Sequence, residues 1–340
     1  MRSFTRRALA PVALGVAVGL AVPATAQEDS SYILATATTG GTYYPVGVAL
    51  ATLVKVKLEP EHGISMSAIS SAGSGENVKL LREDQAQFAI LQGLFGAYAW
   101  HGEGELEAEG KQEHLRSMSM LWQNVEHMVV RNSKAGDGTV AALAEFGGDP
   151  FSIGARNSGT EGSGRQMLQG LGIDPEQVFE VVYMGYGPSA EALQNGTIMG
   201  MNMPGGVPVT GVTQAFANLG DDITILDYTD EQMEQANGKY GIWTRYTIPA
   251  DTYPGQSEEV QTVAQPNFLA VRDDVPEEDV YLILKTIYEN LPFLNNIHAA
   301  TKAMSLDQAI AGLPVPLHPG AARFYEEQGI DIPDELMPPS

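Results

Sequence analysis

The feature that most constrains the fold is a unit that occurs three times: a short strand-like run, a loop of small residues and the start of a helix. The three loops are Thr39–Thr42, Ser71–Gly75 and Ser158–Thr160. Elsewhere, too, short apolar runs alternate with amphipathic stretches, a pattern typical of α/β proteins. We therefore predict an α/β fold in which several strands end beside helix N-termini.

The same units indicate where a small molecule would bind. Strand ends in an open α/β sheet form a crevice for ligands. The first turn of a helix has unpaired N–H groups, and the helix dipole favours negative charge there. If the three loops converge, they form a pocket for a small anion. Each loop taken alone also fits ordinary helix capping, and Ser158–Glu161 matches a capping box.

The first 26 residues match the three-part pattern of a secretory signal peptide. Arg2, Arg6 and Arg7 precede the apolar run Ala8–Val22, and small residues follow up to Ala26. The alternatives are a buried N-terminal helix and a membrane anchor, but the run is shorter than the ~20 residues that span a bilayer. We expect cleavage after Ala26 and a periplasmic location.

Charge and composition exclude several classes of function. The chain has 19 Lys and Arg against 42 Asp and Glu, and removing the three arginines of the signal peptide leaves 16 against 42, a net charge of -26. Such a field repels phosphate backbones, so we expect no nucleic-acid partner. The absence of cysteine excludes disulfides and thiolate chemistry, and the six histidines have no metal-ligand spacing. We predict no metal and no cofactor.

Catalytic motifs are also missing. The chain has no nucleophile elbow, no zinc-protease motif and no true Walker A sequence. We interpret His318, within Pro316–Gly320, as a packed structural residue, and we expect no enzymatic activity. The alternative is a periplasmic hydrolase that uses Ser158 or Ser74 as its nucleophile. A third hypothesis is a sensor or adhesion module that binds another protein.

Four longer segments complete the prediction of secondary structure. Met120–Arg131 and Thr262–Arg272 are long and rich in β-forming residues. Glu277–Leu294 reads as one amphipathic helix, because apolar residues recur at helical spacing. Asp230–Glu259 is rich in acids, Gly, Tyr and Pro and has weak periodicity, so we predict an irregular surface segment.

A series of short motifs runs along the mature sequence. The motifs are Thr39–Pro45, Ser74–Asn77 with Leu80-Leu81, Phe88–Gln92, Ile153-Gly154, Ser158–Thr160, Asn195-Gly196 with Ile198, Gly205, Pro208, Ile248–Ala250, Tyr253–Gly255 and Pro316–Ala321. Single motifs are weak signals, but their order and spacing are specific. On these motifs, the chain resembles the TAXI-type solute receptors of TRAP transporters over nearly all of the mature sequence.

The resemblance implies a two-lobed, type II-like periplasmic-binding-protein fold with two crossing hinge strands. It also implies a small carboxylate solute, such as glutamate or 2-oxoglutarate, and the membrane subunit of a TRAP transporter as partner. We expect a monomer. The two long β-rich segments are the best candidates for the crossing strands. Lobe I would then be residues 27–125 plus 268–340, and lobe II residues 126–267.

The three loops and the segments beside them supply the candidate ligand-binding residues. Arg156 departs from the small residues or proline expected before Ser158. It is either a bidentate carboxylate clamp or a surface residue. The complete predicted set is Gly41, Thr42, Tyr43, Tyr44, Ser74, Gly75, Asn77, Gln92, Arg156, Asn157, Ser158, Gly159, Thr160, Met203, Pro204 and Gly205.

Overall fold

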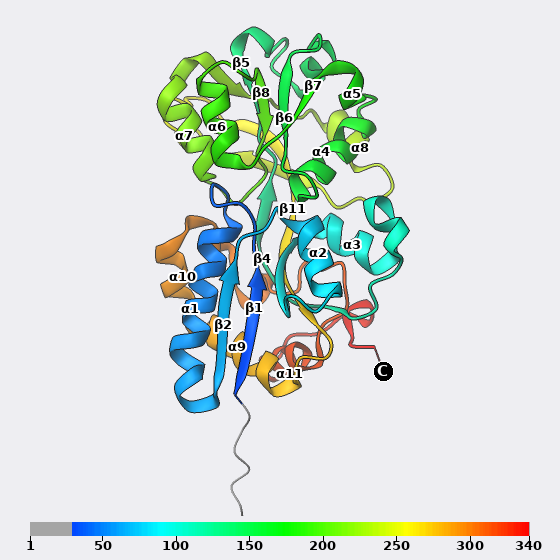
Figure 1. Cartoon of the computed structure of the whole chain (residues 1–340), viewed down its shortest axis with the longest axis vertical. Coiled ribbons are helices and arrows are strands. Elements are labelled where there is room, and N and C mark those ends of the chain that lie inside the picture. The colour runs from blue at the N-terminus through cyan, green and yellow to red at the C-terminus, as the bar shows by residue number, and fades with distance from the viewer. Residues whose placement is uncertain (1–28, 340) are drawn as a thin grey trace, which may run out of the picture.

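The computed structural model describes residues 29–339, which form two lobes, each built on its own β-sheet (Figure 1). The predicted signal peptide, residues 1–26, lies outside the described residues. Within residues 29–339, no helix is long and apolar enough to cross a membrane.

The sheet of the first lobe combines parallel strands with an antiparallel strand that arrives from the other lobe. Its order is β10-β11-β3-β1-β2, and β4 pairs with the remaining edge of β11. Strands β1, β2 and β3 are mutually parallel where they pair, and β11 is antiparallel to both β3 and β4. The bounds are β1 Ser30–Ala35, β2 Ile64–Ile69, β3 Phe88–Gln92, β4 Leu115–Val125, β10 Thr244–Ile248 and β11 Val260–Arg272.

The sheet of the second lobe repeats this plan. Its order is β7-β6-β8-β5-β9, with β6 parallel to β7 and β8, and β5 antiparallel to β8 and β9. In each sheet, therefore, three parallel strands are followed by an antiparallel strand, β11 or β5, and then by a strand at the edge, β4 or β9. The bounds are β5 Met128–Arg131, β6 Pro150–Gly154, β7 Glu180–Tyr183, β8 Gly200–Asn202 and β9 Ile223–Ile225.

Two long chain segments connect the lobes. Strand β4 leads through Glu126 and His127 directly into β5 of the second sheet. Strand β11 pairs with β10 through Val260–Ala264, and with β4 through Ala264–Arg272. This arrangement confirms the predicted two-lobed, type II-like α/β fold with two crossing strands.

Helices cover both faces of each sheet. In Figure 1, α1, α9 and α10 lie on one side of the first lobe, and α2 and α3 lie on the other. The helices of the first lobe are α1 Tyr43–His62, α2 Ser74–Arg82, α3 Gly93–His101, α9 Glu277–Glu289, α10 Leu291–Ile297 and α11 Pro319–Glu327. Those of the second are α4 Gly159–Gly170, α5 Pro175–Val178, α6 Tyr186–Gln194, α7 Thr210–Leu219 and α8 Asp230–Asn237.

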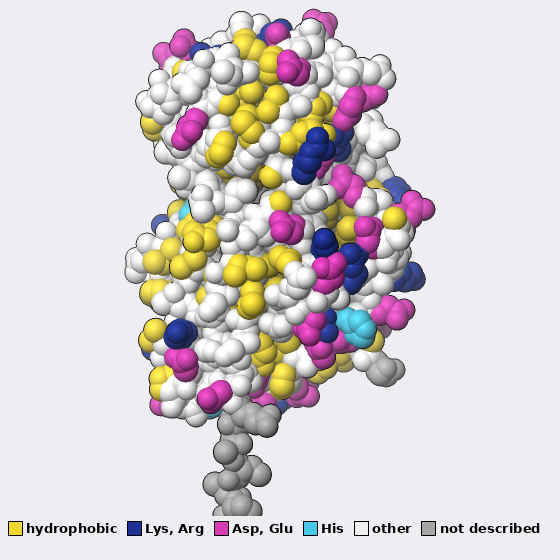
Figure 2. All heavy atoms as spheres, in the orientation of Figure 1, with side chains coloured by type: hydrophobic (Ala, Val, Ile, Leu, Met, Phe, Trp, Pro, Cys, Tyr) yellow, Lys and Arg dark blue, Asp and Glu magenta, His cyan; other side chains and the backbone are white. Residues whose placement is uncertain are grey.

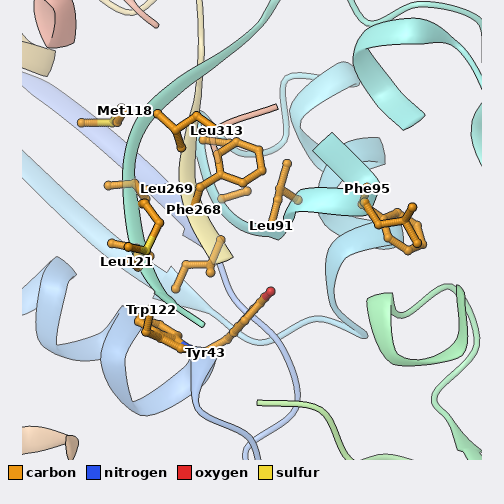
Figure 3. Close-up of a cluster of buried hydrophobic side chains, with 14 of the residues drawn as sticks. Tyr43, Leu91, Phe95, Met118, Leu121, Trp122, Phe268, Leu269 and Leu313 are labelled. Carbon is orange, nitrogen blue, oxygen red and sulfur yellow. The ribbon is translucent and has the colours of Figure 1, made fainter. Parts of the chain in front are cut away.

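The core of the first lobe is packed around the crossing strands. All five residues of β3 are buried, as expected for a strand covered on both faces. Figure 3 shows Trp122 of β4 beside Tyr43 of α1, and their ring centroids are 6.1 Å apart. Phe268 of β11 is fully buried in the same cluster. The start of α1 and the crossing strands are therefore held in one rigid unit.

Two sequence predictions of local structure are wrong. The segment Asp230–Glu259 contains helix α8 and strand β10, where irregular surface was expected. Helix α8 begins with a capping box between Thr229 and Gln232 and buries only Ala236, so it has no apolar stripe to reveal it. The predicted helix Glu277–Leu294 ends at Glu289, because Pro292 has no N–H to continue the ladder and instead occupies the first turn of α10.

Candidate functional site

A small cavity lies between the two lobes, at the ends of the strands. Its volume is about 30 Å³, which is room for roughly two water molecules. The residues that line it come from both lobes and from one crossing strand. They are Ala37, Thr38, Gly41, Thr42, Tyr43, Ala72, Gly73, Ser74, Gln92, Asn124, Gly159, Thr160, Tyr186, Pro204 and Gly205.

The cavity is small because the lobes are closed upon each other. The Glu76 amide of α2 donates to the Asn157 carbonyl of the second lobe at 2.9 Å. On the other side, the Thr42 hydroxyl donates to the Gly206 carbonyl at 3.0 Å. Figure 2 shows that the molecule is narrower where the lobes meet. While these contacts hold, the cavity of about 30 Å³ has no room for an organic molecule.

Two glycines permit this close approach. A Cβ added at Gly159 would lie 2.5 Å from the Gln92 Oε1 atom and 2.8 Å from the Ser74 Oγ atom. A Cβ added at Gly75 would lie 2.5 Å from the Asn157 carbonyl oxygen. Both positions have ordinary backbone conformations, so glycine is required there by contact between the lobes and not by backbone strain.

Helix N-termini converge on the cavity. The first residues of α1, α2, α4 and α6 line it, and Gln92 caps α3 at its edge. Each N-terminus brings free N–H groups and the positive end of a helix dipole. Among the described residues, the amides of Ser74, Gly75, Gly159 and Thr160 have no protein acceptor. No charged side chain lines the cavity in this part of the chain. The arrangement favours an anion.

The hydroxyl groups at the cavity belong to a hydrogen-bonded network. Tyr186 donates to the Pro204 carbonyl at 2.5 Å, so the Thr160 hydroxyl, 2.8 Å away, donates to the Tyr186 oxygen. Ser74 Oγ accepts from the Gln92 amide at 3.1 Å, and its hydroxyl also faces the Tyr43 phenol. Burial raises the pKa of the Tyr43 and Tyr186 phenols, so both stay protonated at physiological pH.

The crossing strands contribute a polar floor. Tyr43 donates to the Asn267 side-chain carbonyl, and Asn267 Nδ2 donates to Asn124 Oδ1 at 3.2 Å. The chain of bonds ends at Asn124 Nδ2, which is buried without a partner among residues 29–339. Gln92 Oε1 is likewise buried and unpartnered. A buried donor or acceptor without a partner is costly, so both atoms are candidates for contact with a ligand.

Nine of the sixteen predicted residues line the cavity. They are Gly41, Thr42, Tyr43, Ser74, Gln92, Gly159, Thr160, Pro204 and Gly205. The other six lining residues were not predicted: Ala37, Thr38, Ala72, Gly73, Asn124 and Tyr186. A signal for Asn124 was present, because an amide near the end of the otherwise largely apolar run Met118–Val125 is unusual for a buried strand. Tyr186 follows a glycine at the start of α6 and had no comparable signal.

The other predicted residues lie beside the cavity. The Arg156 guanidinium is exposed and stacks on the Tyr183 ring, 3.6 Å from its centroid. The Asn77 amide bonds the backbone carbonyls of Thr36 and Ile90. Gly75, Asn157 and Ser158 lie at the contact between the lobes, Tyr44 is half-buried on α1, and Met203 belongs to the core of the second lobe.

The serines proposed for hydrolysis have structural partners. Ser158 Oγ accepts from the Glu161 amide at 3.0 Å as the N-cap of α4. Among the described residues, no histidine is bonded to Ser158 or Ser74. His127 bonds the Val125 carbonyl and the Tyr253 hydroxyl, and His318 Nδ1 accepts from the Gly320 amide as the cap of α11. No observation favours the hydrolase over a binding site.

Comparison with known proteins identifies the family. The NMT1-like family matches residues 34–329 of this chain. The chain belongs to the NMT1-like family.

Distant similarities to solved structures are also found. The alkanesulfonate-binding protein SsuA from Xanthomonas axonopodis pv. citri, bound to MOPS, is 12% identical, with a TM-score of 0.48 over 88% of this chain and 85% of that chain. A binding protein component of an ABC phosphonate transporter from Pseudomonas aeruginosa is 11% identical, with a TM-score of 0.48 over 80% and 79%. Because these identities are low, the fold of the NMT1-like chain is assigned from its own strand order and not from these structures.

Proposed function

We propose that this NMT1-like protein is an extracytoplasmic solute receptor of the TAXI type, which binds a small organic anion between its lobes and delivers it to the membrane subunit of a TRAP transporter. The solute class is a dicarboxylate or an amino acid, such as 2-oxoglutarate or glutamate. The receptor itself performs no chemistry. The predicted signal peptide supports a periplasmic location.

The observation that carries the proposal is the convergence of four helix N-termini on a cavity with no charged lining residue. A carboxylate held by backbone N–H groups needs no arginine, because each charge-assisted hydrogen bond contributes about 1.5–3 kcal/mol. Ser74 supplies a hydroxyl group beside these amides. Arg156, stacked on Tyr183, is not required for the anion in this arrangement.

Lobe closure is the second part of the proposal. The two crossing segments act as the hinge, and a ligand that contacts both lobes favours the closed form. We keep the lobe boundaries at residues 27–125 plus 268–340 and 126–267. Strand β10 and the first part of β11 extend the sheet of the first lobe but pack in the core of the second, so these boundaries assign them to lobe II. The membrane subunit would recognise the closed receptor, which we take to be a monomer.

The test is a binding screen of the mature protein against carboxylates and amino acids. A ligand specific for the folded state at one hundred times its Kd stabilises by about 2.7 kcal/mol, which raises Tm by several degrees. Calorimetry with Ser74→Ala then tests the site, and we expect roughly ten-fold weaker binding or more. Gly187→Ala is the matched control, because a Cβ there meets nothing within 4 Å. If no carboxylate or amino acid raises Tm, the proposal is wrong.

A further inference from the structure

Glu126 is a carboxylic acid buried at the point where the chain crosses between lobes. Its side chain is fully inaccessible to solvent. Strand β11 of the other crossing segment holds its backbone: the Glu126 amide donates to the Val263 carbonyl at 2.9 Å, and the Thr262 hydroxyl donates to the Glu126 carbonyl at 2.9 Å. Its position is therefore fixed by the hinge.

The surroundings of this carboxyl group are polar but contain no cation. The side chains of Trp243, Ser163 and Asn202 face it. Neither carboxyl oxygen has a partner in hydrogen-bonding geometry among the described residues, and Ser163 Oγ and Trp243 Nε1 are unpartnered too. No ion pair to Glu126 is found in this part of the chain. Burial raises the pKa of Glu126 to about 8.

The titratable groups around Glu126 do not neutralise it. The phenols of Tyr43, Tyr186 and Tyr228 lie within reach of its charge, and burial raises the pKa of each. Burial lowers the pKa of His127 to about 4, so this neighbour is uncharged at neutral pH. Arg245, beside Thr262, pairs with the Asp230 carboxylate and the Tyr228 carbonyl.

Glu126 is connected to the candidate ligand site through α4. Asn202, which faces its carboxyl group, has its Nδ2 atom 3.5 Å from the carbonyl of Thr160, a residue that lines the cavity. Ser163 lies one turn after Thr160 on the same helix. An ionised Glu126 therefore places a negative charge behind the helix end that faces the solute, and it opposes an anion there.

We propose that Glu126 couples solute binding to the uptake of a proton: the cleft holds its anion with Glu126 neutral and loses affinity when Glu126 ionises. This inference rests on the proposed function. Because linkage is reciprocal, an anion bound at α4 makes Glu126 retain its proton more strongly. The proton is gained by the carboxyl group itself, so no bond in the solute changes.

The experiment is calorimetry of the mature protein with the tightest-binding carboxylate from the screen, between pH 6.5 and 8.5. Buffers of different ionisation enthalpy report the protons taken up. We expect Kd to rise about threefold over this range, as part of a full coupling of about tenfold, which lies within the five- to 150-fold couplings known for linked sites. If the bound anion raises the pKa of Glu126 from about 8 by roughly one unit, about four-tenths of a proton is taken up per bound anion at pH 8.

The matched pair of variants is Glu126→Gln and Glu105→Gln. Burial and the nearby Glu161 also raise the pKa of Glu105, whose Oε2 atom lies at the contact between lobes, 2.9 Å from a Cβ added at Gly162. We expect Glu126→Gln to bind with no proton uptake and a flat pH profile, and Glu105→Gln to behave as the parent.

Each outcome decides the matter. A parent Kd that is constant across the pH range overturns the inference while leaving the proposed function intact, and so does proton uptake that persists in Glu126→Gln. If Glu126→Gln does not fold, the inference is still tested by the proton uptake and the pH profile of the parent protein and of Glu105→Gln. If no carboxylate binds at any pH, the proposed function fails first and the inference fails with it.

Discussion

Replacing Gly159 with alanine tests whether the lobes close as the structure describes. The new Cβ would lie 2.8 Å from Ser74 Oγ and 2.5 Å from Gln92 Oε1, where ordinary contacts begin at 3.4 Å. Lobe II alone tolerates the change, because Gly159 begins a helix in an ordinary conformation and alanine favours helices by about 1 kcal/mol over glycine. The steric overlap therefore destabilises only the closed form of the protein.

The size of the effect follows from the overlap. The lobes must separate by about 0.9 Å, the difference between 2.5 and 3.4 Å, to relieve both overlaps, or Gln92 and Ser74 must leave their positions. Overpacking of this kind costs about 1–3 kcal/mol. We expect Kd for the tightest carboxylate to rise by about five- to 150-fold.

Calorimetry measures Kd, and scattering measures compactness with and without the carboxylate. Gly75→Ala should behave in the same way, because its Cβ meets the Asn157 carbonyl from the opposite lobe at 2.5 Å. Gly187→Ala, also in the first turn of a helix, should bind within about twofold of the parent. If Gly159→Ala binds as tightly as the parent and closes as fully, the contact between lobes is not part of ligand binding.

The remaining predictions concern the site and the core. Thr160→Val removes the hydroxyl that donates to Tyr186, so we expect roughly ten-fold weaker binding by calorimetry with Tm nearly unchanged. Asn124→Ala removes the unpartnered buried donor, and binding that is as tight as the parent's would exclude Asn124 from ligand contact. Phe151→Ala removes a ring stacked at 4.6 Å on Phe179 and should cost about 3–5 kcal/mol in urea unfolding. Folding lowers the pKa of His127 from 6.5 to about 4, so the neutral imidazole contributes its full stability above pH 6.5 and loses it as pH falls towards 4. His127→Gln should therefore reduce the fall of Tm over this pH range.

The parts of the fold that follow from local sequence were predictable. The loops at Ser71–Gly75 and Ser158–Thr160 each lead into a helix, α2 from Ser74 and α4 from Gly159, as their small residues predict; Ser158 also caps α4 with its side chain. The two-lobed fold and its crossing strands were also expected. Helix α8 was not, because a helix with one buried residue has no periodic apolar face. Pro292 is a sequence signal for the break after α9, although the predicted helix Glu277–Leu294 runs past it.

The site was predictable mainly where glycine-rich loops mark it, and Asn124 had only a weak signal within its strand. Glycines that contact the opposite lobe, such as Gly159, look the same in a sequence as glycines in ordinary turns. The polar floor formed by Asn124 and Asn267 depends on the pairing of two strands that are more than one hundred residues apart. Such pairing is a tertiary property, and no local pattern specifies which amide is left without a partner.

The central claim is that backbone N–H groups of facing helix N-termini hold an organic anion between the lobes. A crystal structure of the mature protein with the tightest-binding carboxylate tests it most directly. We expect carboxylate oxygens within hydrogen-bonding distance of the amides of Gly159 or Thr160 from one lobe and of Ser74 or Gly75 from the other. A carboxylate held instead by Arg156, or bound outside the cavity between the lobes, would contradict the account.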